Sequence, residues 1–196
     1  MFAIVDYDTG NTRNLKKAFD YLQVSTILTA DPQQLAAADA VILPGVGAFA
    51  AAMAALKERQ LVGVLQALAR SGKPVLGICL GMQLLFESSS EYGEHAGLGL
   101  LSGRVSALPT DLNVKVPQMG WNQNELRRPD SPFASIDAAY TYFVHSYYAV
   151  CPATESCGDS STRRPGSKYC SASKCDWDAV SPGEEWSSRI TTTSSF

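Results

Sequence analysis

Short apolar runs alternate with helical stripes along the first half of the chain. Runs of strand length occur at residues 2–5, 25–28, 40–43 and 74–78. Between the first two runs, apolar side chains at positions 15, 18, 19 and 22 have the spacing of one helical face. Residues 48–69 are rich in alanine and leucine and predict one or two further helices. This alternation predicts an α/β fold, with a mostly parallel central sheet and helices on both faces.

The second half of the chain changes in character. Residues 81–87 predict the first turns of a helix, and the segments after them are richer in β-forming residues. Strand-like patterns occur at residues 100–108, 114–117 and 140–150, of which the last is the strongest in the chain. We therefore expect additional antiparallel β segments beside the parallel sheet.

The composition breaks near residue 155. Residues 156–196 contain eleven serines, no leucine and no methionine, and their branched aliphatic residues are Val180 and Ile190 alone. A segment so poor in aliphatic side chains buries too little apolar surface to offset the entropy of ordering it. The sequence thus predicts one domain over residues 1–155, followed by a largely disordered tail over residues 156–196.

The overall composition is that of a globular protein. Of the 196 residues, 45% are hydrophobic and 18% are charged, and the net charge is −3. This charge argues against nucleic acid or an acidic membrane surface as a partner. No apolar run is long enough to span a bilayer, and no Cys/His spacing indicates a metal site. We expect a cytoplasmic protein with no metal and no cofactor.

One cysteine has a distinctive setting at the end of the fourth apolar run. Cys79 lies between Gly77 and Gly81, where the predicted strand meets the predicted helix. A Gly-x-nucleophile-x-Gly turn is a nucleophile elbow, because the glycines allow a tight backbone that exposes the central side chain. The helix N-terminus favours a thiolate, and its N–H groups are able to hold an oxyanion. Cys79 is therefore the candidate nucleophile.

Four motifs, in this order along the chain, resemble one family. They are PGVGAF at 44–49, GICLGMQ at 77–83, KVPQMGWN at 115–122 and YFVHSYY at 142–148. The second resembles the nucleophile segment of class I, triad-type glutamine amidotransferases. Together, over residues 2–155, they resemble the glutaminase subunits of imidazole glycerol phosphate synthase, from histidine biosynthesis. The resemblance implies a flavodoxin-like core.

The resemblance also implies roles for individual residues. Cys79 attacks the carboxamide carbon of glutamine, forms a glutamyl thioester and releases ammonia. Backbone N–H groups at Leu80 and in the loop of Val46 and Gly47 form the oxyanion hole. Four further residues are implied to bind the backbone end of glutamine: Gln83, His145, Ser146 and Tyr147.

A partner is implied as well. In this family the glutaminase forms a heterodimer with a cyclase subunit, a (β/α)8 barrel through which the ammonia travels. Trp121 and Asn122 fall where the family has its subunit interface. An exposed Trp is enriched in such interfaces.

The chain departs from the family at its catalytic base. A cysteine amidotransferase needs a histidine base and an orienting carboxylate, and the family takes both from a His-Pro-Glu-Lys-Ser motif near its C-terminus. This chain has two histidines. His95 is expected in a solvated loop, and His145 belongs to the YFVHSYY motif. The expected base is therefore missing.

The tail offers an explanation in the genetic code. The codons for residues 176–186 (DWDAVSPGEEW), read from their second nucleotide, are able to encode Ile-Gly-Met-Gln-Phe-His-Pro-Glu-Lys-Ser. That string contains the missing motif. We infer that the chain is out of frame after about Glu155, through a one-nucleotide insertion or deletion in the gene or in its determined sequence. The polypeptide is then expected to be inactive and to fold poorly.

Two other interpretations stay open from the sequence. One is a non-catalytic binding subunit that docks on the cyclase without hydrolysing glutamine. The other is a different α/β enzyme with an elbow cysteine, such as a cysteine peptidase. In that enzyme the base that reaches Cys79 has to be His145 or His95.

Overall fold

A parallel sheet organises the N-terminal half. The computed structural model describes residues 1–8, 11–109, 115–124, 135 and 138–151, with three two-residue strands at 169–170, 173–174 and 191–192. Within these residues the sheet has five strands in the order β11-β4-β3-β1-β2. Its strands are β1 (Phe2–Val5), β2 (Thr26–Thr29), β3 (Ala40–Leu43), β4 (Val75–Gly77) and β11 (Tyr169–Cys170). The predicted parallel central sheet is confirmed.

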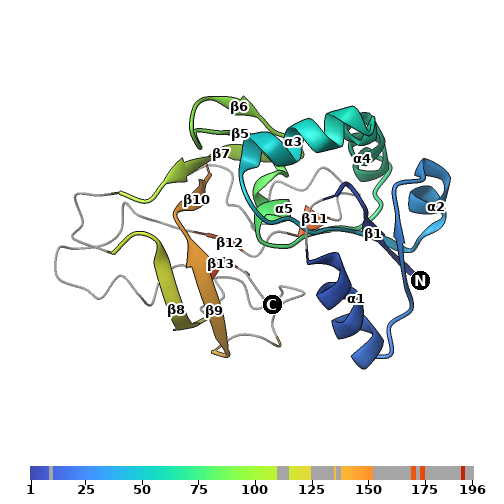
Figure 1. Cartoon of the computed structure of the whole chain (residues 1–196), viewed down its shortest axis with the longest axis horizontal. Helices are drawn as coiled ribbons and strands as arrows, with labels where there is room; N and C mark the ends of the chain where they lie inside the picture. The colour runs from blue at the N-terminus through green and yellow to red at the C-terminus, as the bar shows by residue number, and fades with distance from the viewer. Residues whose placement is uncertain are drawn as a thin grey trace.

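Helices cover both faces of this sheet, as predicted (Figure 1). Helix α1 (Thr12–Tyr21) lies on one face, and α3 (Phe49–Glu58) and α4 (Leu61–Arg70) lie on the other. Helix α2 (Pro32–Ala37) was not predicted, although its start is well marked. The Asp31 side chain accepts a hydrogen bond from the N–H of Gln33 at 2.9 Å, and Pro32 occupies the first helical position. No helix of the described part of the chain has the length and apolar character to cross a membrane.

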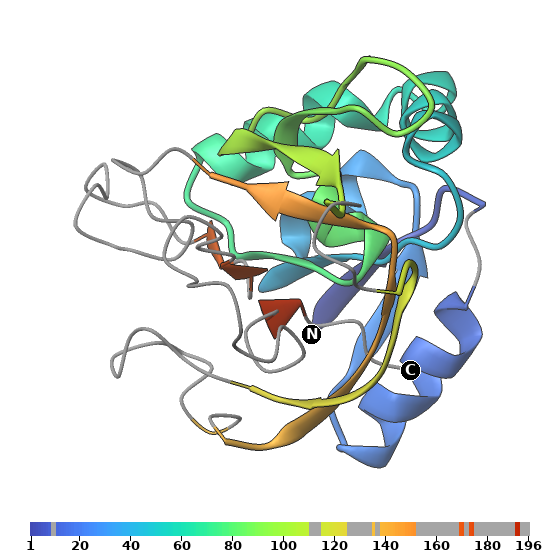
Figure 2. The same ribbon diagram turned by 90° about the vertical axis from the view of Figure 1, so that its left-hand side faces the viewer.

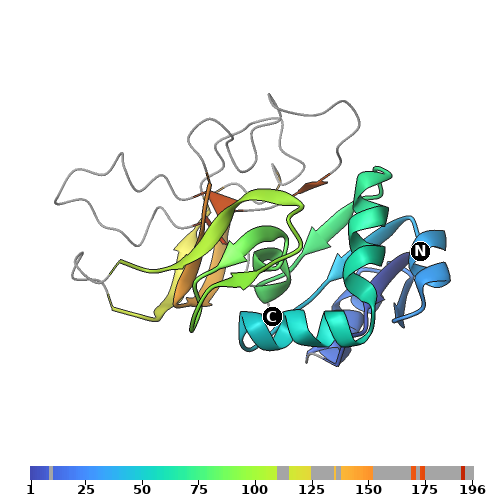
Figure 3. The same ribbon diagram turned by 90° about the horizontal axis from the view of Figure 1, so that it is seen from above.

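Two further sheets supply the predicted antiparallel segments. Among the described residues, one sheet has four strands in the order β10-β7-β5-β6, and another pairs β8 with β9. These strands are β5 (Phe86–Ser89), β6 (His95–Ala96), β7 (Leu101–Ala107), β8 (Gln118–Gln123), β9 (Tyr140–His145) and β10 (Tyr147–Val150). Strand β9 leads directly into β10, so the chain passes from the two-stranded sheet into the four-stranded one (Figure 2). Viewed from above, β8 and β9 lie at the opposite end of the molecule from β2 and α2 (Figure 3).

The structure corrects the helix predicted at residues 81–87. Helix α5 (Leu80–Gln83) is a single turn, and the chain becomes strand β5 at Phe86. After the single turn, the carbonyls of residues 84–86 accept hydrogen bonds from N–H groups of residues 98–101. These residues therefore pair with a segment distant in sequence, which the local pattern of side chains does not reveal.

Two strand predictions also change. The run predicted at 140–150 divides at Ser146 into β9 and β10, which belong to different sheets. The segment predicted at 114–117 lies just before β8, which begins at Gln118, and residue 114 is outside the described residues. Both differences arise because the chain leaves one sheet to join another, which the local pattern of side chains does not encode.

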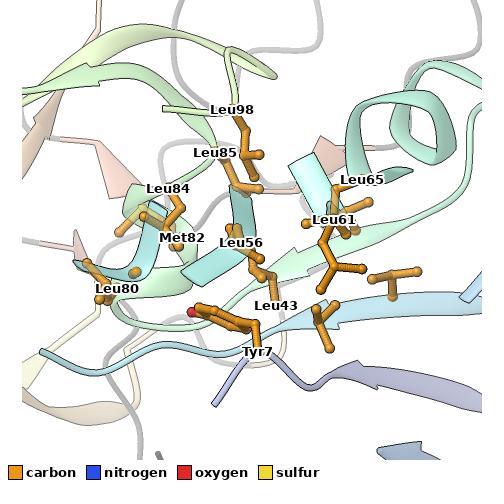
Figure 4. Close-up of a cluster of buried hydrophobic side chains, with 14 of the residues drawn as sticks. Tyr7, Leu43, Leu56, Leu61, Leu65, Leu80, Met82, Leu84, Leu85 and Leu98 are labelled. Atoms are coloured by element: carbon orange, nitrogen blue, oxygen red, sulfur yellow. The ribbon is translucent and has the colours of Figure 1, made fainter. Parts of the chain in front are cut away.

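The main core lies between the parallel sheet and the helices α3, α4 and α5. Leu43, Leu56 and Leu61 are buried there together with the ring of Tyr7 (Figure 4). Leu80 and Met82 of α5, the helix that follows the elbow turn and is called the elbow helix below, belong to the same cluster. The segment around Cys79 is therefore anchored in the core of the domain.

Most of the tail predicted to be disordered, residues 156–196, lies outside the described residues. The exceptions are β11, β12 (Ser173–Lys174) and β13 (Thr191–Thr192). Strand β11 pairs in parallel with β4, with Tyr169 opposite Val75 and Cys170 opposite Leu76. Disorder elsewhere in the tail stays a prediction.

The two glycines at 63 and 81 give a matched stability test. A Cβ on Gly81 would lie 1.9 Å from the Leu43 carbonyl oxygen, whereas a Cβ on Gly63, exposed in the first turn of α4, would meet nothing within 4 Å. We expect Gly81→Ala to lower the free energy of unfolding by about 3 kcal/mol or more. Gly63→Ala should raise it by about 0.5–1 kcal/mol. Urea unfolding checks both values, and a Gly81→Ala protein as stable as the parent would contradict the close approach.

Candidate active site

Cys79 occupies a strained turn between β4 and α5. Its backbone has φ 53° and ψ −122°, which costs a residue with a side chain about 1–3 kcal/mol. The flanking glycines are needed for steric reasons. A Cβ on Gly77 would lie 2.4 Å from the Cα of Met82, and Gly81 passes equally close to the end of β3. The turn has the strand-to-helix geometry of a nucleophile elbow.

Loops from three neighbouring strands meet at this edge of the sheet. Tyr7 follows β1, the loop 44–47 follows β3, and Cys79 follows β4. These strands are adjacent and parallel, so their carboxyl ends share one edge, where ligands of such sheets bind. A Cβ on Gly45 would lie 2.7 Å from the backbone nitrogen of Gly81. The predicted oxyanion loop therefore packs directly on the elbow.

Two side chains that the sequence analysis did not single out hold the ends of this loop. The fully buried Tyr7 donates its hydroxyl hydrogen to the Pro44 carbonyl at 2.5 Å. Glu91 accepts a hydrogen bond from the N–H of Phe49 at 2.7 Å, at the start of α3. The position of Tyr7 directly after the first strand was a usable signal, whereas Glu91 becomes visible only in the folded chain.

Three of the four predicted glutamine-binding residues are brought together. The Gln83 side-chain amide donates to the Tyr147 carbonyl at 3.3 Å, and His145 Nδ1 lies 3.0 Å from the same oxygen. A carbonyl only accepts, so Nδ1 carries the hydrogen and Nε2 is left as an acceptor. Within the described part of the chain, this buried Nε2 has no hydrogen-bond partner. The fourth residue, Ser146, lies at the break between β9 and β10.

Two opposing effects set the ionisation of Cys79. Burial raises the pKa of the thiol, because a thiolate is poorly solvated there, and a hydrogen bond from the Leu80 backbone N–H lowers it by a smaller amount. The net shift is upward. The Leu80 N–H at the start of the helix does favour the thiolate, as expected, but its effect is smaller than that of burial.

Neither histidine is among the causes of the pKa shift of Cys79. Within the described residues, those causes are burial and the Leu80 N–H. His145 is committed to Tyr147, and burial lowers its pKa. His95, expected in a solvated loop, is instead half-buried in β6, where it pairs with Ser89. No group of three or more His, Cys, Asp or Glu in this part of the chain is placed to hold a metal ion.

Comparison with known proteins accounts for the elbow and the loops around it. Residues 3–167 match the family described as "Glutamine amidotransferase class-I". The chain is 62% identical over 150 residues to the "Imidazole glycerol phosphate synthase subunit HisH" of Lacticaseibacillus casei (strain BL23), covering 76% of this chain and 72% of that protein. The chain belongs to the HisH family of class I glutamine amidotransferases.

A second relative and a solved structure are also similar to this chain. The protein of the same name from Listeria monocytogenes serovar 1/2a is 49% identical over 152 residues, covering 78% of this chain and 73% of that protein. A crystal structure of a glutamine amidotransferase superposes with a TM-score of 0.61 at 17% identity, over 77% of this chain and 75% of that one. At this identity the likeness shows the fold alone. About a quarter of the chain and a quarter of each HisH relative lie outside the matched regions.

The two residues predicted at the subunit interface of this HisH chain lie on opposite faces of the β8–β9 sheet. Trp121 is 69% exposed, and its ring lies 5.5 Å from that of Tyr142 on the paired strand. Asn122 is 7% exposed, and its side-chain oxygen accepts a hydrogen bond from Gln118 at 3.0 Å. Of the predicted pair, only Trp121 is open to another chain. Three more exposed apolar residues share its face: Met119, Tyr140 and Val144.

The raised Cys79 pKa gives a pH prediction. The rate at which iodoacetamide modifies Cys79, followed by mass spectrometry of its peptide, should rise with a midpoint above the ordinary value of 9.0. In urea, where burial is lost, the midpoint should fall back toward about 8.5. Because the folded-state pKa is the higher one, the protonated thiol makes its full contribution to the free energy of unfolding below the unfolded-state pKa. That contribution is lost as the pH rises through the folded-state pKa. A native midpoint below the urea value would show that a thiolate-stabilising group reaches Cys79.

Proposed function

We propose that this chain is a glutaminase subunit in which Cys79 attacks the side-chain carboxamide carbon of glutamine. Addition of the thiolate gives a tetrahedral intermediate. Its C–N bond breaks as a proton reaches the nitrogen, which releases ammonia and leaves a glutamyl thioester; water then forms glutamate and regenerates the thiol. Membership of the HisH family supports this chemistry, and the formed elbow at Cys79 is the structural observation that carries it.

The negative oxygen of the tetrahedral intermediate is assigned to N–H groups around the elbow. The Leu80 N–H already hydrogen-bonds to Cys79, and the loop of Val46 and Gly47 follows the Gly45 contact with the elbow. Val46 is 47% exposed and Gly47 has φ 88°, so this part of the loop is open to a ligand. Each such donor is worth about 3–4 kcal/mol in comparable sites.

The backbone end of glutamine is assigned to the β9–β10 junction. Gln83 projects from the elbow helix to Tyr147, and His145 reaches the same carbonyl from the end of β9. These contacts place residues 145–147 beside the helix that carries Cys79. We assign Gln83, His145, Ser146 and Tyr147 to this end of the pocket.

The catalytic base is the part that this chain lacks, and a shifted reading frame explains the loss. The Cys79 pKa is raised, and no histidine lowers it. Similarity to the HisH relatives covers about 150 residues, and about a quarter of each relative has no matched counterpart here. The codons of residues 176–186 fit the missing His-Pro-Glu-Lys-Ser motif in the neighbouring frame. We propose that translation leaves the family frame after about Glu155.

The chain as written should therefore release no ammonia from glutamine, even with a cyclase subunit and its ribotide present. Without a base the thiol stays protonated near neutral pH, and nothing delivers a proton to the leaving nitrogen. Deleting one nucleotide, or adding two, just after codon 155 should restore the activity. A coupled assay for glutamate measures both proteins, with Cys79→Ala in the repaired protein as the blank.

Two results would count against this account. One is turnover by the chain as written that disappears in His145→Ala, since it would make His145 the base. The other is a gene whose nucleotides at codons 176–186 do not read His-Pro-Glu in the neighbouring frame.

The proposed partner is the cyclase subunit of the synthase, in the cytoplasm, and the proposed docking surface is the exposed face of β8–β9. This face gathers Trp121 and Tyr142 with the neighbouring exposed residues Met119 and Val144. Exposed aromatic and methionine side chains in a contiguous group are typical of interface cores. The buried reverse face, which includes Asn122, keeps the two strands in place.

Trp121→Ala should weaken binding to a cyclase subunit by about 2 kcal/mol or more, roughly thirtyfold, because a central Trp is commonly a hot spot. The matched control is Tyr21→Ala, which removes an aromatic side chain, 88% exposed, from α1. Titration calorimetry with a HisH-partner cyclase measures both. Equal affinity for the two variants would place the interface elsewhere.

The raised Cys79 pKa also favours a second candidate, a non-catalytic subunit that binds the cyclase and hydrolyses nothing. This candidate predicts normal cyclase binding by the chain as written. It further predicts that the frame-repaired protein gains no glutaminase activity. The same coupled assay therefore separates the two candidates.

A further inference from the structure

Tyr7 is a buried polar side chain at the site to which the proposed chemistry assigns no role. It follows β1, its ring lies in the main core, and it is 0% exposed. Its hydroxyl end is directed toward the side of the core where Leu80 lies (Figure 4). There it donates a hydrogen bond to the Pro44 carbonyl at 2.5 Å.

The Tyr7 hydroxyl, Gly45 and Gly81 pack so closely that the backbone at Gly45 has little room to move. A Cβ on Gly45 would lie 2.9 Å from the Tyr7 oxygen and 2.7 Å from the Gly81 nitrogen. The Pro44–Gly45 peptide is thus enclosed between the tyrosine and the elbow. A peptide unit is planar, so rotating it moves its carbonyl and its N–H together. Any such rotation breaks the hydrogen bond that the buried Pro44 carbonyl accepts from Tyr7, and losing a bond to a buried carbonyl is costly.

We propose that Tyr7 is a positioning residue for the oxyanion loop. By holding the Pro44 carbonyl, it fixes the peptide plane from which Val46 and Gly47 continue toward the space beside Cys79. The inference rests on the proposed function, since it assumes that this loop supplies N–H groups to glutamine. Tyr7 touches no reacting atom and acts through the backbone of the loop.

The geometry explains why a tyrosine stands here. The loop after Pro44 has no comparable hold of its own: Val46 is half exposed, and a Cβ on Gly47 would meet nothing within 4 Å. Among the described residues, the next side chain to hold the loop is Glu91, which accepts a hydrogen bond from the N–H of Phe49. A phenylalanine at position 7 would keep the apolar ring in the core and remove only the hydroxyl. The two parts of the side chain are therefore separable by one substitution.

The test compares two reagents at Cys79 in the full chain, for the parent and for Tyr7→Phe. The first is the chloroketone analogue of glutamine, L-2-amino-4-oxo-5-chloropentanoate, whose ketone oxygen takes up negative charge as the thiolate adds to its carbon. The second is iodoacetamide, which the thiolate attacks by displacing iodide. Both end as thioethers on sulfur, with loss of halide. Because both need the same thiolate, the ratio of their rate constants cancels the thiolate fraction.

Tyr7→Phe should lower this ratio about tenfold while leaving the iodoacetamide rate unchanged. The effect should be smaller than the about 10²–10³ seen when an oxyanion donor is itself removed. Leu65→Val, which takes a methylene from the same core, is the stability-matched control and should lower the melting temperature without changing the ratio. Gly47→Ala changes the loop beyond the core, at a residue with φ 88°, and should also lower the ratio.

The possible outcomes distinguish failure of the proposed glutamine pocket from failure of the proposed role of Tyr7. A parent ratio equal to that of free N-acetylcysteine would overturn the proposed glutamine pocket, and this inference with it. A high parent ratio that Tyr7→Phe leaves unchanged would overturn the role of Tyr7 alone. An equal fall in both rates would show a general loosening and would also overturn it. If Tyr7→Phe does not fold, an unchanged ratio in Gly47→Ala still overturns the proposal, because the loop would then have no influence on the reagent.

Discussion

The close approach of the elbow to the end of β3 is the constraint on which the site depends. Gly81 passes so near the Leu43 carbonyl that no side chain fits between them, and the same carbonyl accepts a hydrogen bond from the N–H of Ile78 at 3.0 Å. This contact fixes how the chain turns after β4. It forces Cys79 into its strained conformation and brings the loop after Pro44 against the elbow.

The strain and the burial of Cys79 have different causes and different consequences. Strain comes from the short turn and is balanced by the core contacts of Leu80 and Met82. Burial raises the pKa of the thiol, and the hydrogen bond from the Leu80 N–H is too weak to reverse this upward shift. A thiol in this position is well aimed but weakly ionised, so it needs a base to become a nucleophile. The elbow turn is thus formed within residues 1–151, whereas the base is the part that we propose is missing.

The β9–β10 junction joins the elbow to the exposed face of β8–β9. Tyr147 contributes one carbonyl that Gln83 and His145 both reach, and the break at Ser146 turns the chain from one sheet into the other. Trp121 and Tyr142 lie on the two-stranded sheet that ends at this junction. The proposed substrate pocket and the proposed docking surface are therefore consecutive along a few residues of chain, with the elbow helix packed beside them.

The local pattern of side chains was enough to predict β1, β3 and the elbow turn, whereas the interface position of Trp121 came only from the family resemblance. These three features depend on neighbours in sequence: an apolar run of four residues for each strand, and two glycines around Cys79 for the turn. The proposal that the family's catalytic base is missing also came from the sequence, since it concerns which residues the chain contains.

Other features depended on partners far along the chain, and only the tertiary structure decided them. The chain leaves the helix after Gln83, and the carbonyls of residues 84–86 pair with N–H groups of residues 98–101. The burial of Asn122 and the direction of the Cys79 pKa shift follow from packing against distant elements. The proposed role of Tyr7 depends on β1 and β3 being neighbours, because a hydrogen bond between residues 37 positions apart leaves no mark in local sequence.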